Sequence, residues 1–186
     1  MSLTMEAAEI PAAATPPSFE AAYREHAQTV ARWARQLGGA GIEVEDVVQE
    51  VFVVVSRKLA GFRGDAKFTS WLFEVTRKTT ANHRRRQRWR FWQRPGSARL
   101  ALVSSDAGDP HAELERRQMA EMFYSALDRL PEKYRTVLVL YEIEGLSTQA
   151  IADLCQINWS TVKVQLHRAR ELFLARYQHA MKKGKT

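Results

Sequence analysis

The sequence predicts an all-α protein built from two small helical domains joined by a flexible linker. Apolar residues recur at three- and four-residue spacing along most of the 186-residue chain, and no long segment alternates apolar and polar residues as a strand would. Residues 95–109 interrupt this pattern with glycines and serines, which is the composition of a linker. We therefore expect a disordered tail at residues 1–17, a first domain at 18–94 and a second domain at 110–180.

Three helices are expected in the first domain. The first begins after Ser18, which can cap it, and ends at the glycine pair 38–39. The second covers about 43–59; its valines would suit a strand, but its length and spacing favour a helix. The third starts near Thr69 and runs into a tract of arginines. The apolar residues that recur at helical spacing in the first two helices are Phe19, Tyr23, Val30, Trp33, Ala34, Leu37, Val44, Val47, Val48, Val51, Phe52 and Val55. In the third helix, Trp71, Leu72, Val75 and Thr79 are expected to face inward.

The second domain restarts at residues 109–110, an aspartate cap followed by proline at the first helical position. Pro131 ends this helix and opens the next one. Ser147 then caps a short helix, and a turn at 155–158 leads to a last helix that extends to about Tyr177. The expected core residues of the first three helices are Leu114, Met122, Phe123, Ala126, Leu127, Leu130, Tyr134, Val137, Leu138, Tyr141, Ile151, Ala152 and Leu154.

The net charge of +7 indicates an acidic partner, either nucleic acid or an anionic membrane. Much of the positive charge lies in an arginine tract between residues 77 and 99, with Glu74 the only nearby acid. Arginines alone would bind phosphates, whereas Trp89, Phe91 and Trp92 within the tract could stack on unpaired bases. These three aromatic residues could equally pack within the fold, and the sequence leaves both interpretations open.

Cysteine use and hydropathy exclude several classes of protein. Cys155 is the single cysteine, so an internal disulfide and a cysteine-based zinc site are excluded, which fits a reducing cytoplasm. Because Cys155 neighbours a tight turn, we expect a small buried residue rather than a redox sensor. No apolar run approaches the ~20 residues that cross a bilayer, and the N-terminus lacks the pattern of a secretory signal. We expect a cytoplasmic protein without a cofactor or a metal.

The segment from Ser147 to Arg170 has the arrangement of a helix-turn-helix, which can place its second helix in a major groove. At ~100° per residue, Val162, Leu166, Ala169 and Phe173 cluster on the side facing the core. The side chains expected to read duplex DNA are Ser160, Thr161, Lys163, Val164, His167 and Arg168. The alternative is a three-helix bundle with a solvated basic face.

One helix has a polar face that is not basic. Asp46, Gln49 and Glu50 lie together at spacings of three and four, opposite the valines. An acidic and amide face in a basic protein suggests a protein partner held by hydrogen bonds and charge pairs. A solvated helix face is the alternative.

The motifs in their order along the chain resemble extracytoplasmic-function sigma factors of bacterial RNA polymerase, group 4 of the sigma-70 family. The likeness covers about residues 18–178. Four stretches carry it: Glu45-Asp46-Val47-Val48-Gln49-Glu50-Val51-Phe52, then Phe62-Arg63-Gly64-Asp65 with Phe68-Thr69-Ser70-Trp71-Leu72, then Leu130-Pro131-Glu132-Lys133-Tyr134-Arg135, and finally Thr161-Val162-Lys163 through Leu166-His167-Arg168-Ala169-Arg170.

The resemblance implies a two-part promoter reader. Asp46, Gln49 and Glu50 would bind the β′ clamp of the polymerase core, whose β flap is a further contact. The second domain would read the minus-thirty-five element as duplex, and the first would capture the melted minus-ten strand, with one base flipped near the loop 62–69. The residues implied at the minus-ten element are Arg63, Phe68, Lys78, Asn82, Arg84, Arg85 and Arg86. An anti-sigma factor would restrain the protein.

Four positions depart from the family pattern. Lys78 replaces a common asparagine and Asn82 a frequent aspartate, so the minus-ten preference is open. Gln156 stands where the turn of the helix-turn-helix normally has glycine, and Asn158 is expected to cap the reading helix. Ala150 replaces a common acidic residue, so a full capping box after Ser147 is missing.

Two other functions compete with this interpretation. A stand-alone helix-turn-helix regulator would use the same second domain, but it would not need the acidic and amide helix joined to the segment 62–72. A nuclease or nucleotidyl transferase would need clustered carboxylates or histidines to hold a metal. The acidic residues at 43–50 are split around one helix, and the five histidines are scattered. We therefore expect no enzyme.

Overall fold

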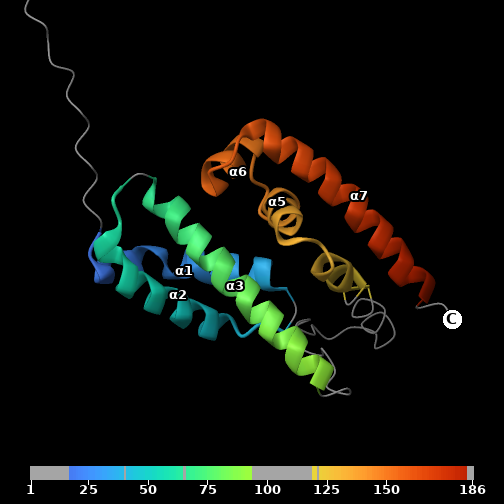
Figure 1. Ribbon diagram of the computed structural model, residues 1–186, viewed down its shortest axis with the longest axis horizontal. Coiled ribbons are helices and arrows are strands. Elements are labelled where there is room, and N and C mark those ends of the chain that lie inside the picture. Colours follow the sequence, from blue (N-terminus) through green and yellow to red (C-terminus); the bar gives the residue numbers. More distant parts are fainter. Residues whose placement is uncertain (1–16, 40, 65, 94–118, 121, 184–186) are drawn as a thin grey trace, which may run out of the picture.

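The computed structural model describes residues 17–39, 41–64, 66–93, 119–120 and 122–183, and this part of the chain is all-α, as the sequence predicts (Figure 1). Residues 1–16 of the tail expected at 1–17, the expected linker at 95–109 and the expected helix start at 109–110 lie outside the described residues. No helix of the described part is long and apolar enough to cross a membrane.

The first domain consists of α1 (Phe19–Gly38), α2 (Val44–Lys58) and α3 (Phe68–Gln93), with a short 3-10 turn, η1 (Leu59–Gly61), after α2. Ser18 caps α1 as predicted: its Oγ accepts a hydrogen bond from the Ala21 amide at 3.2 Å. Gly39 ends α1 with a φ of 77°. Val47, Val51 and Val55 of α2 are fully buried where α2 packs against α1 and α3, whereas Val53 is exposed.

The second domain contains a helical segment at 122–128, then α5 (Glu132–Glu142), α6 (Thr148–Cys155) and α7 (Trp159–Lys183). The predicted end of the last helix at Tyr177 is wrong, because α7 continues to Lys183. The apolar pattern fades after Tyr177, but residues 178–183 contain neither glycine nor proline, so nothing there ends a helix. Loss of an apolar stripe therefore marks where packing ends, not where α7 ends.

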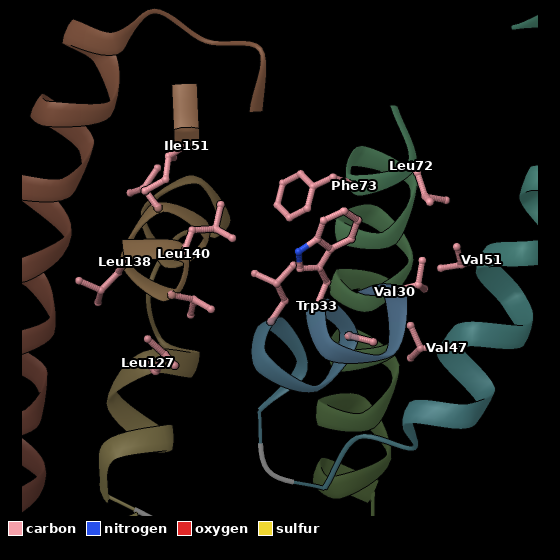
Figure 2. Close-up of a cluster of buried hydrophobic side chains, with 14 of the residues drawn as sticks. Val30, Trp33, Val47, Val51, Leu72, Phe73, Leu127, Leu138, Leu140 and Ile151 are labelled. Carbon is pink, nitrogen blue, oxygen red and sulfur yellow. The ribbon is translucent and has the colours of Figure 1, made fainter. Parts of the chain in front are cut away.

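A single cluster of buried apolar side chains extends through both domains (Figure 2). In the first domain, Trp33 of α1 meets Phe73 of α3 edge to face, with ring centroids 5.1 Å apart. Both rings lie on the side that faces Leu140 and Ile151 of the second domain. Phe73 is fully buried and was not among the predicted core residues. Its position shows that α3 buries two sides, one against α1 and α2 and one toward the second domain.

Polar contacts also join the two domains. Ser70 of α3 donates to the Asp153 carbonyl of α6 at 3.1 Å, and Arg32 of α1 pairs with Glu144 at 3.3 Å. The fully buried Arg135 of α5 donates from Nε to the Leu37 carbonyl at 3.0 Å, at the end of α1. That carbonyl belongs to a helix terminus, where the helix itself supplies no donor. The two predicted domains are thus packed against each other, an arrangement that the sequence did not predict.

Candidate nucleic-acid interface

The turn between α6 and α7 is built without glycine. Gln156 adopts the left-handed conformation there, with φ 54° and ψ 44°, and the Ile157 amide donates to the Ala152 carbonyl at 3.1 Å. Asn158 caps α7 as predicted, because its Oδ1 accepts from the Ser160 amide at 2.9 Å. The segment therefore folds as the helix-turn-helix that the sequence predicts, with glutamine in the position usually given to glycine.

The two sides of α7 separate as its spacing predicts. Val162, Leu166 and Ala169 are buried against α5 and α6. On the opposite side, the residues predicted to read duplex DNA are exposed, except that Thr161 is half-buried; the exposed ones are Ser160, Lys163, Val164, His167 and Arg168. Val164 is 68% exposed, although valine is more often buried in folded proteins.

Two outward basic side chains of α7, His167 and Arg168, have only weak intramolecular partners. Arg168 and His167 both approach the Glu171 carboxylate, at 2.9 Å and 3.6 Å. All three side chains are exposed, by 48% or more, and exposed ion pairs of this kind contribute little free energy. The side chains are therefore available to exchange Glu171 for a phosphate or a base edge.

Sequence reasoning missed Trp159, the first residue of α7. Its indole Nε1–H donates to Oγ1 of Thr148 at 3.0 Å, and the Lys163 ammonium lies over its ring, 3.6 Å from the centroid. The spacing of four between Trp159 and Lys163 brings the side chains together on one face of a helix. That spacing of four at the start of α7 was the sequence signal that could have revealed the pair.

A second basic face lies on α3. Lys78, Asn82 and Arg85 share this face with Trp89, since the positions are separated by three or four residues. Trp89 is 67% exposed, so it does not pack against the described part of the fold. The side chains of Phe91 and Trp92 lie outside the described residues.

Glu74 is the acid nearest to the face of Lys78, Asn82, Arg85 and Trp89. It forms a two-atom hydrogen bond with Arg77 and pairs with Lys78 at 3.1 Å. The hydrogen bonds from Arg77 lower the pKa of the Glu74 carboxyl, which therefore stays ionised. Both oxygens of the Glu74 carboxylate accept hydrogen bonds from Arg77. Glu74 therefore competes only weakly with a nucleic acid for the cations further along α3.

Two of the predicted minus-ten arginines form ion pairs within the protein, but only Arg84 is buried by them. Arg84 points toward the second domain, where its guanidinium pairs with Glu132 at 2.8 Å and with Asp128 at 3.4 Å. Its side chain is only 8% exposed. Arg86 remains exposed and lies 3.4 Å from Glu50 of α2. The structure thus groups Lys78, Asn82, Arg85 and Arg86 at the surface and separates Arg84 from them.

An aromatic cluster closes the loop before α3. The rings of Phe62, Phe68 and Trp71 lie 5.5 to 5.7 Å apart, and His26 of α1 approaches Phe68 at 5.4 Å. All four residues are half-buried, and the neighbouring Arg63 is exposed. Phe68 and Trp71 therefore belong to one partly exposed aromatic wall at the N-terminal end of α3.

The acidic and amide face of α2 is narrower than predicted. Asp46 and Gln49 are exposed, but Glu50 turns toward α3 and its carboxylate lies 2.6 Å from Nε2 of His83. Its spacing predicted Glu50 on the same face as Asp46, yet its side chain contacts His83 and Arg86 of α3. The free part of this face is Asp46 and Gln49.

The chain matches two models of known families, one in each domain. Residues 22–90 match Sigma-70 region 2, and residues 120–173 match Sigma-70 region 4. The RNA polymerase sigma-H factor of Pseudomonas aeruginosa is 32% identical over 139 residues, which cover 69% of this chain and 70% of that protein. The ECF RNA polymerase sigma factor SigE of Mycolicibacterium smegmatis is 30% identical over 162 residues, or 83% of this chain and 60% of that protein.

The chain belongs to the extracytoplasmic-function sigma factors of the sigma-70 family. The match to region 2 decides against a stand-alone helix-turn-helix regulator, because it falls on the first domain. Sigma factors are DNA-binding transcription initiation factors. A similar fold is seen in the sigma factor RpoE of Bartonella quintana, solved with the anti-sigma factor NepR, with a TM-score of 0.54 and 20% identity over 88% of this chain and 96% of that one.

Proposed function

We propose that this sigma factor reads promoters with two separate basic surfaces and binds the polymerase core through a third surface. Region 2 would occupy residues 18–94 and region 4 residues 110–180, with a linker at 95–109. The observation that carries the proposal is the presence of exposed cations on α7 and α3, in different domains, beside the non-basic face of Asp46 and Gln49 on α2. These three surfaces correspond to three tasks of a sigma factor: binding the minus-thirty-five duplex, capturing the melted minus-ten strand and binding the polymerase core.

The α7 surface is suited to the minus-thirty-five duplex. Lys163 and Arg168 can donate to guanine or phosphate, and the exposed Val164 can pack on a thymine methyl group. Ser160, Thr161 and His167 complete the surface that would face the major groove.

The α3 surface is suited to the melted minus-ten strand. Lys78, Arg85 and Arg86 supply charge for the backbone, and Asn82 supplies an amide for a base edge. Trp89 offers an exposed ring on which an unpaired base can stack. Arg63 and the ring of Phe68 lie at the other end of α3, where a flipped base would enter.

The α2 face would bind the β′ clamp through Asp46 and Gln49, with Glu50 positioned between that face and α3. The β flap of the polymerase is a second expected contact. An anti-sigma factor is the expected restraint, since the similar sigma factor from Bartonella quintana was solved with one. Such partners would place the protein in the cytoplasm, and the proposed function uses neither a cofactor nor a metal.

Binding to purified bacterial core polymerase, followed by transcription from a promoter library, tests the proposal. Arg168→Glu should abolish minus-thirty-five recognition and keep core binding, whereas Asp46→Ala with Gln49→Ala should weaken core binding and keep the fold. Arg24→Glu on exposed α1 is the charge-matched control for Arg168→Glu. Loss of the same activity in both variants would contradict the division of labour. Tight duplex binding without core binding would instead support a regulator.

A further inference from the structure

Trp159 is held in place at the point where the helix-turn-helix meets DNA. Thr148 and Trp159 are the first residues of α6 and α7, and the hydrogen bond from the indole to Thr148 joins these two helix starts. The residue remains 43% exposed. In this motif the N-terminal residues of the second helix contact base edges. The indole is therefore both fixed and accessible at the proposed reading surface.

Lys163 is fixed in turn by Trp159. Its ammonium lies over the indole ring and forms a cation–π contact. Tryptophan is the best of the aromatic residues for such a contact. A lysine on a helix surface otherwise samples many rotamers, and ordering them on binding costs free energy. Because the ring holds the ammonium before DNA arrives, much of this ordering is already complete in the free protein.

We propose that Trp159 is a positioning residue that holds Lys163 ready for the minus-thirty-five duplex. Thr148 fixes the indole, the indole fixes the ammonium, and the ammonium makes the contact with phosphate or guanine. The proposal rests on the proposed function, because it needs α7 to read duplex DNA.

A double-mutant cycle in the reconstituted holoenzyme tests this role, on the promoter selected from the library. Trp159→Ala should weaken promoter binding about two- to fivefold, the scale of an exposed cation–π contact. In the Lys163→Gln background, Trp159→Ala should change the affinity little, because the side chain that it positions is gone. Trp159→Phe keeps an aromatic face and should retain more affinity than Trp159→Ala.

A purely structural role for Trp159 predicts a different result. Trp159→Ala would then lower the affinity by the same factor with Lys163 or Gln at position 163, and such additivity would overturn the proposal. If the wild-type holoenzyme showed no dependence on the minus-thirty-five sequence, the proposed function would fail instead. The two failures are therefore distinguishable.

A second, independent observation concerns Arg84. This arginine is among the residues implied at the minus-ten element, yet Glu132 and Asp128 of the second domain enclose its guanidinium. Asp128 also accepts from Arg135 at 3.1 Å, and Arg135 in turn holds the Leu37 carbonyl of α1. Carboxylates of one domain thus occupy the guanidinium of an arginine of the other domain, which cannot bind a DNA phosphate while these pairs persist.

The packed arrangement cannot read both promoter elements. Elements centred at minus ten and minus thirty-five are about 25 base pairs apart, or about 85 Å at a rise of about 3.4 Å per pair. A compact chain of this length has a radius of gyration of only about 16 Å. The domains must therefore separate on the promoter, and separation also frees Arg84.

We infer that the pairs of Arg84 with Glu132 and Asp128 form an intramolecular latch that masks Arg84 in the free protein. The inference rests on the minus-ten role that the resemblance to sigma factors implies for Arg84, beside the residues of the proposed function. The acidic residues of the second domain would compete with DNA for Arg84 of the first domain, before any partner protein binds.

Two isosteric substitutions on α5 test the latch in the full chain. Glu132→Gln removes the pair with Arg84, whereas Glu142→Gln removes a pair with Arg170 that lies within the second domain. The two substitutions change the net charge equally and lie on the same helix. Glu132→Gln should raise the affinity for a single-stranded minus-ten oligonucleotide about two- to fivefold over Glu142→Gln, and it should increase the radius of gyration in X-ray scattering.

Equal affinities and equal radii for the two variants would overturn the latch. An expanded Glu132→Gln with unchanged oligonucleotide affinity would also overturn it, because Arg84 would then be free without binding DNA. Arg84→Gln in the holoenzyme distinguishes failure of the latch from failure of the proposed function. If other α3 variants weaken minus-ten capture and Arg84→Gln does not, the role of Arg84 at the minus-ten strand fails, but the proposed function stands.

Discussion

Gln156 holds a backbone conformation that favours glycine. A residue with a Cβ costs about 1–2 kcal/mol in the left-handed region, and the Gln156 side chain is exposed. Glycine removes this strain but loses more entropy on folding. We expect Gln156→Gly to raise the free energy of unfolding by about 0.5–1 kcal/mol in urea titrations. Gln156→Ala is the control and should give no gain; equal gains for both would show that the turn conformation is not the cause.

Cys155 is the other residue of this turn with a testable chemistry. Burial raises the pKa of its thiol to about 12, so almost none of it is thiolate at pH 8. We expect alkylation by iodoacetamide at pH 8 to be far slower in the folded chain than in urea. The raised pKa also means that the thiol contributes stability below its unfolded pKa, and that this stability is lost as pH rises toward about 12.

A control variant isolates the part of the alkaline destabilisation that belongs to Cys155. Cys155→Ala should flatten the stability profile between about pH 9 and 12, relative to the wild type. Alkylation of the folded chain as fast as that of the unfolded chain would show that the thiol is not protected.

At the scale of the element, α7 depends on one side chain at its start. Asn158 Oδ1 accepts from both the amide and the hydroxyl of Ser160, at 2.9 Å and 2.8 Å. Asn158→Ala should cost about 1 kcal/mol of unfolding free energy and should also weaken minus-thirty-five binding, because the first turn of α7 loses its cap. Ser147→Ala removes a similar cap from α6 and should cost similar stability with less effect on duplex affinity. Equal losses of affinity would indicate a global effect.

The helices show which structural features the local sequence predicts and which it does not. Their existence, the caps at Ser18, Ser147 and Asn158, and the two faces of α7 all follow from spacing and capping chemistry within a few residues. The end of α7 did not, because a helix can continue after its apolar stripe stops. Glu50 also departed from its predicted face, since its side chain responds to His83 and Arg86 on another helix.

At the scale of the whole molecule, the packing of the two domains was invisible in the sequence. A domain interface depends on residues far apart in the chain. Nothing in the sequence near Arg135 predicts that it is buried between the Leu37 carbonyl and Asp128. Burial lowers the pKa of Arg135 to about 10, a direction that reflects the cost of removing its charge from water. A buried charge of this kind is maintained only by its partners, so the interface is specific in geometry.

Two glycines with positive φ allow this interface to be tested without touching a charged residue. A Cβ on Gly39 would meet the Arg135 guanidinium at 3.0 Å, whereas a Cβ on Gly145 would meet nothing within 4 Å. Both Gly39→Ala and Gly145→Ala should lose about 1–3 kcal/mol of stability through backbone strain. Only Gly39→Ala should also displace Arg135 and loosen the contact between domains, which small-angle scattering would detect as a larger radius of gyration. Identical radii for the two variants would mean that Arg135 adjusts without opening the interface, and the closed arrangement would then depend mainly on the shared apolar core around Trp33 and Phe73.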